Sequence, residues 1–108
     1  MKSVMIVFNQ ASTERVEYML DTLGISGFTF WENVQGRGSG SFGRNDDSQR
    51  RPGMPHRGTH TWPEMNNALL TVVDDEQVAP LLHAVRQLDK RNEEVGVRAF
   101  VWNVEQAV

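Results

Sequence analysis

Cysteine is absent from this sequence of 108 residues, and tyrosine occurs only once. Without cysteine, disulfide bridges and thiolate-bound metal sites are excluded. No apolar stretch approaches the roughly 20 residues that a membrane-spanning helix needs. The short apolar run at the N-terminus ends at polar Asn9 and Gln10, so we interpret it as a first strand rather than a signal peptide. These absences predict one cytoplasmic domain over residues 1–108.

Charge is unevenly distributed along the chain, whose net charge is −3. Residues 34–60 contain five arginines and two aspartates, a net charge of +3, so the remainder carries −6. A basic segment on an acidic body indicates contact with a phosphate or an acidic protein surface. The alternative is that the arginines only keep a mobile loop soluble. We do not expect nucleic acid as a partner, because the body is acidic and its strand aromatics are typical of a core.

Hydrophobic periodicity predicts four strands and two helices. One helix is expected from a cap at Ser12 to Gly24, and a second is capped by Asp74 or Asp75. Because Pro80 lacks an N–H, the second helix is expected to begin a little after its cap. The expected strands are 2–8, 28–34, 66–74 and 95–104.

The resulting order, β-α-β-β-α-β, predicts an α+β, ferredoxin-like sandwich. Its antiparallel sheet has two helices on one face and a long loop between the second and third strands. On the second strand we expect Phe28, Phe30 and Val34 to share one face. The strands are apolar on both sides, so the face without helices predicts an obligate oligomer; isolated exposed apolar residues are the alternative. The residues assigned to that second face are Met5, Val7, Trp31, Leu69, Val73, Phe100 and Trp102.

The loop at residues 34–60 is far longer than the two to five residues that a hairpin needs. Loops of this length are usually functional or disordered. Lengthening a flexible loop costs only about 0.6 kcal/mol per doubling, so stability does not forbid it.

Two stretches carry a resemblance to a known family: LGISGFTFWENVQGRG (23–38) and VGVRAFVWNVEQA (95–107). With the predicted element order, they make the chain similar to the PII signal-transduction (nitrogen regulatory) family, as a divergent PII-like member. The resemblance implies that the long loop is a T-loop and that the chain forms a compact homotrimer with its sheets facing inward. It also implies adenine nucleotide (ATP, ADP or AMP) in clefts between subunits, and a T-loop that docks onto a membrane transporter or an enzyme.

The resemblance also assigns site residues. Gly36, Arg37 and Gly38 match the base of the T-loop, and Arg98 stands where the family has a phosphate-binding lysine. Glycine lets backbone N–H groups approach phosphate, and arginine binds it in bidentate fashion. The match is incomplete: the segment before Arg98, the B-loop, keeps only Gly96, the family's C-terminal arginine segment is absent, and the long loop has no tyrosine.

His56 and His60 lie near the end of the long loop and are candidate ligands for a divalent transition metal. Some PII-like branches are linked to cation transport, which makes a metal-binding PII-like protein an alternative function. The other reading is that both histidines are ordinary polar loop residues, since two ligands alone do not complete a site. His83, beside the apolar stripe of the second helix, is interpreted as a structural or surface residue.

The main hypothesis is therefore a non-enzymatic regulator: a trimeric sensor of a small-molecule effector whose loop changes conformation and binds a target. A small ferredoxin-like enzyme is the alternative from another class. Its chemistry has no support, because the sequence offers neither a cysteine nucleophile nor a carboxylate pair at a telling spacing.

Overall fold

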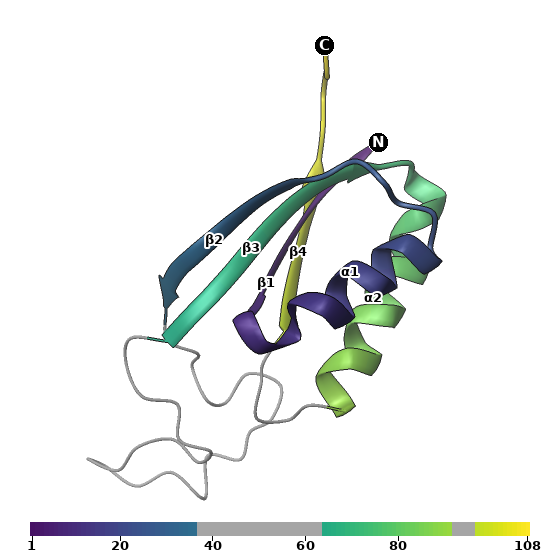
Figure 1. Cartoon of the computed structure of the whole chain (residues 1–108). Helices are drawn as coiled ribbons and strands as arrows, with labels where there is room; N and C mark the ends of the chain where they lie inside the picture. The colour runs from purple at the N-terminus through teal and green to yellow at the C-terminus, as the bar shows by residue number, and fades with distance from the viewer. Residues whose placement is uncertain (37–63, 92–96) are drawn as a thin grey trace, which may run out of the picture.

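Two helices cover one face of a four-stranded antiparallel sheet (Figure 1). The computed structural model describes residues 1–36, 64–91 and 97–108. The strand order in the sheet is β2-β3-β1-β4, and the element order confirms the predicted α+β ferredoxin-like fold. None of the helices in these ranges is long and apolar enough to cross a membrane. The elements are β1 (Lys2–Asn9), η1 (Gln10–Ser12), α1 (Thr13–Thr22), β2 (Thr29–Gly36), β3 (Glu64–Val73), α2 (Asp75–Arg91) and β4 (Val97–Asn103).

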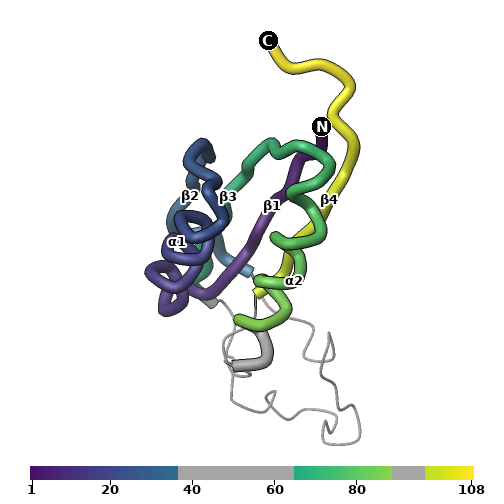
Figure 2. Tube along the Cα trace, turned by 90° about the vertical axis from the view of Figure 1, so that its right-hand side faces the viewer, coloured from purple at the N-terminus to yellow at the C-terminus, as the bar shows by residue number. Residues whose placement is uncertain are grey.

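The core lies between the sheet and the helices. Helix α1 covers the half of the sheet that contains β2 and β3, while α2 packs beside β4 (Figure 2). From central strand β1, Val4, Ile6 and Phe8 are at most 1% exposed, as their alternation predicts. The rings of Phe8 and Phe30 stack with centroids 6.3 Å apart, which links β1 to the edge strand β2. The other buried core residues are Val16, Met19, Leu20, Ile25, Leu69, Val73, Leu81, Val85 and Val97.

The assignment of β3 residues to faces was wrong. Leu69 pairs with Ile6, and Val73 pairs with Lys2, so both lie on the helix-covered face and are buried. Their neighbours Leu70 and Val72 lie on the open face instead. A strand that is apolar on both sides gives no sequence signal for its phase, because a shift of one residue leaves both faces apolar.

A β-bulge in β2 overturns the prediction that Phe30 and Val34 share a face. Trp31 pairs with Ala68, but Val34 pairs with Asn66, so the phase changes between them. Val34 therefore lies on the open face with Trp31, whereas Phe30 packs against the core. The extra residue of a bulge inverts the alternation beyond it, and the alternation of this strand did not reveal it.

The predicted cap position of α1 is confirmed at Ser12, but the expected side-chain capping hydrogen bond is not formed. Ser12 immediately precedes the helix but makes no capping hydrogen bond, and among the described residues its buried Oγ has no partner. Instead Asn9 Oδ1 accepts a hydrogen bond from the N–H of Ala11 at 2.9 Å and begins the short turn η1. The predicted end is confirmed: Gly24 has φ 76°, and its N–H donates to the carbonyl of Asp21.

Helix α2 begins directly at its cap rather than a little later. Gln77 Oε1 accepts from the N–H of Asp74 at 3.0 Å, and the N–H of Gln77 donates to the Asp74 carbonyl at 2.9 Å. The side-chain bond from Gln77 back to the Asp74 N–H is one half of a capping box, and it marks Asp74 as the cap position. It holds the first turn in place, so Pro80 is accommodated inside the helix.

Candidate nucleotide site at the loop end of the sheet

The strand and helix ends that flank the two segments marked as functional by the sequence lie at one end of the sheet (Figure 1). Strand β2 ends at Gly36 and β3 begins at Glu64, so the long loop joins the sheet here. Helix α2 ends and β4 begins at this same end, on either side of residues 92–96. Strand β1 also ends here, at Asn9. We call this end of the sheet the loop end.

Gly36 is the last residue of β2 and pairs with Glu64. A Cβ added at Gly36 would lie 3.3 Å from Asn66 Nδ2, which is tighter than ordinary van der Waals contact. The absence of a side chain therefore permits close approach of the Asn66 amide to the backbone at the start of the loop.

Arg98 is half-buried on the open face of β4 and pairs with Val7 of β1. Strands β2 and β4 are the two outer strands, so three interstrand spacings, about 14 Å in total, separate them. Since Val7 pairs with Ala68, Arg98 is also four residues, about 13 Å, from Gly36 along the strand direction. These two of the four predicted phosphate-site residues lie toward the loop end, but a single chain does not bring them together on one phosphate.

The remaining predicted site residues, Arg37, Gly38, His56 and His60, lie outside the described residues. Within residues 1–36, 64–91 and 97–108, no three or more acidic or histidine side chains gather in a way that could hold a metal ion. The hypothesis of a histidine metal site therefore stays a prediction about the loop itself.

Sequence reasoning missed a group of polar side chains beside the start of the loop. Gln10, Thr13, Asn33 and Asn67 join the turn η1, helix α1, the bulge of β2 and strand β3 through hydrogen bonds. The available signal was the pair Asn66-Asn67 in an otherwise apolar strand. Because strand residues alternate, one of two adjacent asparagines has to face the core.

The open face of the sheet carries large apolar side chains that no described element of the chain covers. Trp31 is 44% exposed, Phe100 49% and Trp102 46%. Half-buried Met5, Val7 and Leu70 and the exposed Val72 lie on the same face. We call these seven residues the open-face patch; a contiguous apolar surface of this kind is typical of a protein interface.

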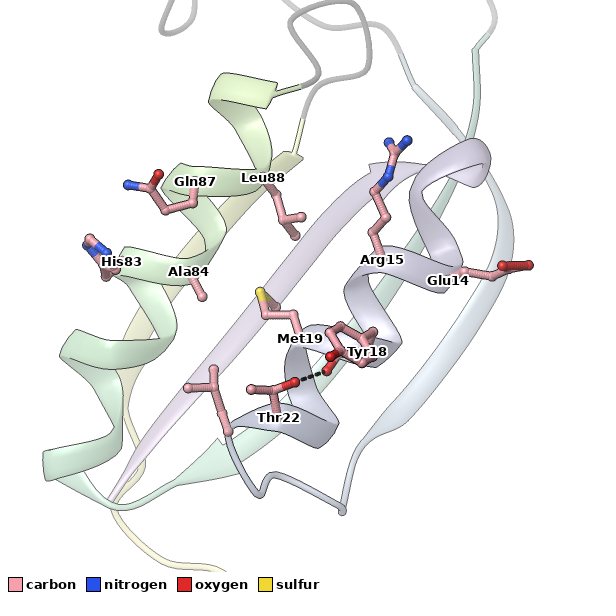
Figure 3. Close-up of a pocket in the computed structure, with 10 residues that line it drawn as sticks. Glu14, Arg15, Tyr18, Met19, Thr22, His83, Ala84, Gln87 and Leu88 are labelled. Atoms are coloured by element: carbon pink, nitrogen blue, oxygen red, sulfur yellow. Dashed lines mark hydrogen bonds between the residues drawn. The ribbon is translucent and has the colours of Figure 1, made fainter.

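A separate groove of about 670 Å³ lies between α1 and α2, on the helix layer (Figure 3). Met19, Leu23, Ala84 and Leu88 contribute apolar walls, and exposed His83 lies on its α2 side. The predicted surface reading of His83 is consistent with this position. Gly36 and Arg98, the predicted ligands that the structure describes, do not line this groove.

Among the described residues, the carboxyl group whose pKa is shifted lies at the opposite end of the sheet. The N-terminal ammonium donates a hydrogen bond to Asp75 Oδ1 at 2.7 Å and lowers the pKa of that carboxyl below its usual value of 3.8. Asp75 follows the far end of β3, so this ion pair plays no part at the loop end.

Comparison with known proteins connects this geometry to a family. The family model described as nitrogen regulatory protein P-II matches residues 1–108. The chain belongs to the P-II family. This confirms the resemblance drawn from the two sequence stretches, and P-II proteins are signalling regulators rather than enzymes. A search of curated proteins by sequence finds no match.

Solved structures of PII-like proteins share the fold. CPII from Thiomonas intermedia K12 bound to ADP, AMP and bicarbonate is 20% identical, with a TM-score of 0.63 over 99% of this chain and 94% of that one. Apo CPII is 18% identical, with a TM-score of 0.62 over 95% and 89%. A putative PII-like signalling protein from Thermus thermophilus is 27% identical, with a TM-score of 0.56 over 95% and 85%.

Proposed function

We propose that this P-II protein is a trimeric sensor of adenine nucleotide, whose long loop changes conformation on binding and docks onto a target transporter or enzyme. The observation that carries the proposal is that the described residues flanking the two segments, Gly36 and Glu64 on one side and Arg91 and Val97 on the other, lie at the same end of the sheet. The binding of ADP and AMP by CPII, which has the same fold, favours this class of ligand.

The separation of Gly36 from Arg98 favours a site shared between subunits. One chain places them on opposite outer strands, whereas a neighbouring subunit packed on the open face would bring further groups toward the same phosphates. The open-face patch supplies the apolar surface that such packing requires. The proposal therefore links assembly to binding: a subunit that cannot trimerise lacks a complete nucleotide site.

Calorimetry with ADP, AMP and ATP tests the binding site, with Arg98→Ala as the variant. Loss of a charge-assisted hydrogen bond to phosphate costs about 1.5–3 kcal/mol, so ADP affinity is expected to fall about 10- to 100-fold. Arg86→Ala removes the same charge from an exposed position on α2 and serves as the matched control, with unchanged affinity. Equal affinity of Arg98→Ala and the wild-type protein would rule out the phosphate role of Arg98.

Bicarbonate belongs in the same experiment, because two of the CPII structures contain it together with ADP. Titrating ADP with and without bicarbonate shows whether the two ligands bind cooperatively. If they do, each raises the affinity of the other by the same factor. Product analysis over the same period tests the regulator against the enzyme hypothesis, since a sensor leaves ADP and ATP unchanged.

The metal alternative is tested separately. Titration with Zn²⁺ or Ni²⁺ should show binding that His56→Ala and His60→Ala each weaken strongly, if those histidines are ligands. Binding that survives both substitutions would show that the metal is held by other residues. If no metal binds, the metal hypothesis is refuted and the nucleotide hypothesis remains. We also propose that the protein acts in the cytoplasm, as its sequence predicts and as membership of the P-II family favours.

A further inference from the structure

Asn67 is an unusual residue for its position. It lies on the helix-covered face of β3, in line with Leu69, Thr71 and Val73, and is only 4% exposed. A buried amide is unfavourable unless its polar atoms are hydrogen-bonded. Its retention in the core therefore depends on the partners that it finds there.

Those partners come from two other elements. Asn67 Oδ1 accepts a hydrogen bond from the backbone N–H of Asn33 at 3.2 Å, and Asn67 Nδ2 donates to Thr13 Oγ1 at 2.8 Å. Thr13 Oγ1 donates to the carbonyl of Gln10 at 2.7 Å, and Gln10 Nε2 donates to Asn33 Oδ1 at 2.5 Å. The four residues form a closed ring of hydrogen bonds, which we call the asparagine ring.

The ring holds the β-bulge of β2. Asn33 has φ 58°, a left-handed conformation that asparagine tolerates better than most residues. The bulge lies only three residues before Gly36, and Asn67 lies three residues after Glu64. The end of β2 and the start of β3, which flank the long loop, are therefore attached to the turn η1 and to the start of α1.

A bulge bends its strand and increases its local twist, so its geometry sets the direction in which β2 presents the loop. We propose that Asn67 is a positioning residue for the nucleotide site: through the asparagine ring it fixes the bulge and thereby the base of the long loop. The inference rests on the proposed function, because it assigns a regulator of that same site. Nucleotide affinity then depends on the fraction of molecules whose loop base is correctly held.

Thr71 provides a matched control four residues along the same face of β3. It is 2% exposed, and its Oγ1 donates to the carbonyl of Gly27 at 2.6 Å, at the end of β2 away from the loop. Thr71→Val removes a buried side-chain hydrogen bond of the same strand without touching the ring. Asn67→Leu removes both hydrogen bonds of Asn67 while keeping the number and branching of its side-chain heavy atoms.

The experiment measures ADP affinity by calorimetry and amide hydrogen exchange at Asn33 in the wild-type protein and both variants. Asn67→Leu is expected to weaken ADP binding about tenfold, the effect of a tenfold fall in the fraction of molecules whose loop base can bind ADP. Amide exchange at Asn33 should become faster by about the same factor. Thr71→Val should stay within about twofold of wild type in both, although it lowers stability.

Asn33→Gly guards against a failure of Asn67→Leu to fold. Asn33 is exposed, and glycine accepts its positive φ, so this variant removes only the side-chain bond from Gln10. It should weaken ADP binding in the same direction, by about threefold, if the ring contributes to the loop base.

The outcomes separate the inference from the proposed function. Unchanged exchange at Asn33 in Asn67→Leu refutes control of the bulge by the ring, whether or not ADP binds. Faster exchange with unchanged ADP affinity, or equal weakening in Thr71→Val, refutes the positioning role. If the wild-type protein does not bind ADP, the proposed function fails and the positioning role falls with it, whereas the exchange result would still report whether Asn67 protects the Asn33 amide.

Discussion

The two faces of the sheet are built from similar residues but differ in what covers them. On the helix-covered face, Val4 and Ile6 are completely buried by elements of the same chain. On the open face, Phe100 and Trp102 remain nearly half exposed. Burial of the first face therefore stabilises the isolated subunit. The second face contributes its full hydrophobic free energy only when another surface covers it.

The adjacent leucines of β3 show the difference most directly. Leu69 is 1% exposed in the core, while Leu70 is only half-buried on the open face. They have the same side chain, the same strand and almost the same position. Any difference between their substitutions therefore reports the faces rather than the residue type.

The largest expected effect is Leu69→Ala. Removing a fully buried leucine leaves a cavity, and the free energy of unfolding should fall by about 3 kcal/mol. Leu70→Ala is the matched control and should cost less than about 1 kcal/mol under conditions in which the subunits are separate. Denaturant unfolding at fixed protein concentration measures both. Equal losses would mean that the two faces are equally buried within the subunit.

The next effect concerns assembly. Phe100→Lys places a charge within the open-face patch, beside Met5, and loss of a buried interface aromatic typically costs about 2 kcal/mol or more. Native mass spectrometry and sedimentation should show smaller species than the trimer expected for the wild-type protein. Tyr18→Lys, on α1 and 74% exposed, should leave the assembly unchanged. An identical mass for Phe100→Lys and wild type would contradict assembly through this face.

A smaller effect is expected at the turn that follows α1 and leads into β2. Gly24 has φ 76° and open space around it, so Gly24→Ala meets only backbone strain, about 1–2 kcal/mol. Gly27 also has open space but no positive φ, so Gly27→Ala should be neutral or slightly stabilising. Thermal unfolding of both variants checks this. A neutral Gly24→Ala would show that the turn does not need its left-handed residue.

The smallest effect is expected at the end of the sheet opposite the loop end, where the exposed N-terminal ammonium pairs with Asp75. The lowered pKa of Asp75 means that its contribution to stability is present above about pH 3.8, the unfolded value, and is lost as pH falls through the folded pKa. NMR titration of the Asp75 carboxyl should show this pKa below 3.8, and N-terminal acetylation or high salt should bring it back toward 3.8. A titration that acetylation does not change would exclude the ion pair as its cause.

Prediction from sequence succeeded where periodicity or a local signal was strong. The helical stripe of Val16, Met19 and Leu20, and the end of α1 at Gly24, were confirmed. It failed where the signal was symmetrical or depended on distant partners. The phase of β3 is ambiguous because both of its faces are apolar, and the bulge at Asn33 depends on Asn67, 34 residues away.

The candidate site shows the same limit. Gly36 and Arg98 were selected from sequence, yet the separation between them follows from a sheet order in which β2 and β4 are the outer strands. The asparagine ring was missed altogether, because its members are brought together only by folding. Local patterns report propensity, whereas polar networks depend on which elements become neighbours.

The amino-acid sequence by itself determined the order of elements, the P-II family and the presence of a long basic loop, because each depends on residues close together in the chain. Only the tertiary structure decided which leucine faces the core, where β2 changes phase and which side chains hold the base of the loop. The physical reason is that pairing register and buried hydrogen bonds join residues distant in sequence, and their free energy depends on specific neighbours rather than on composition.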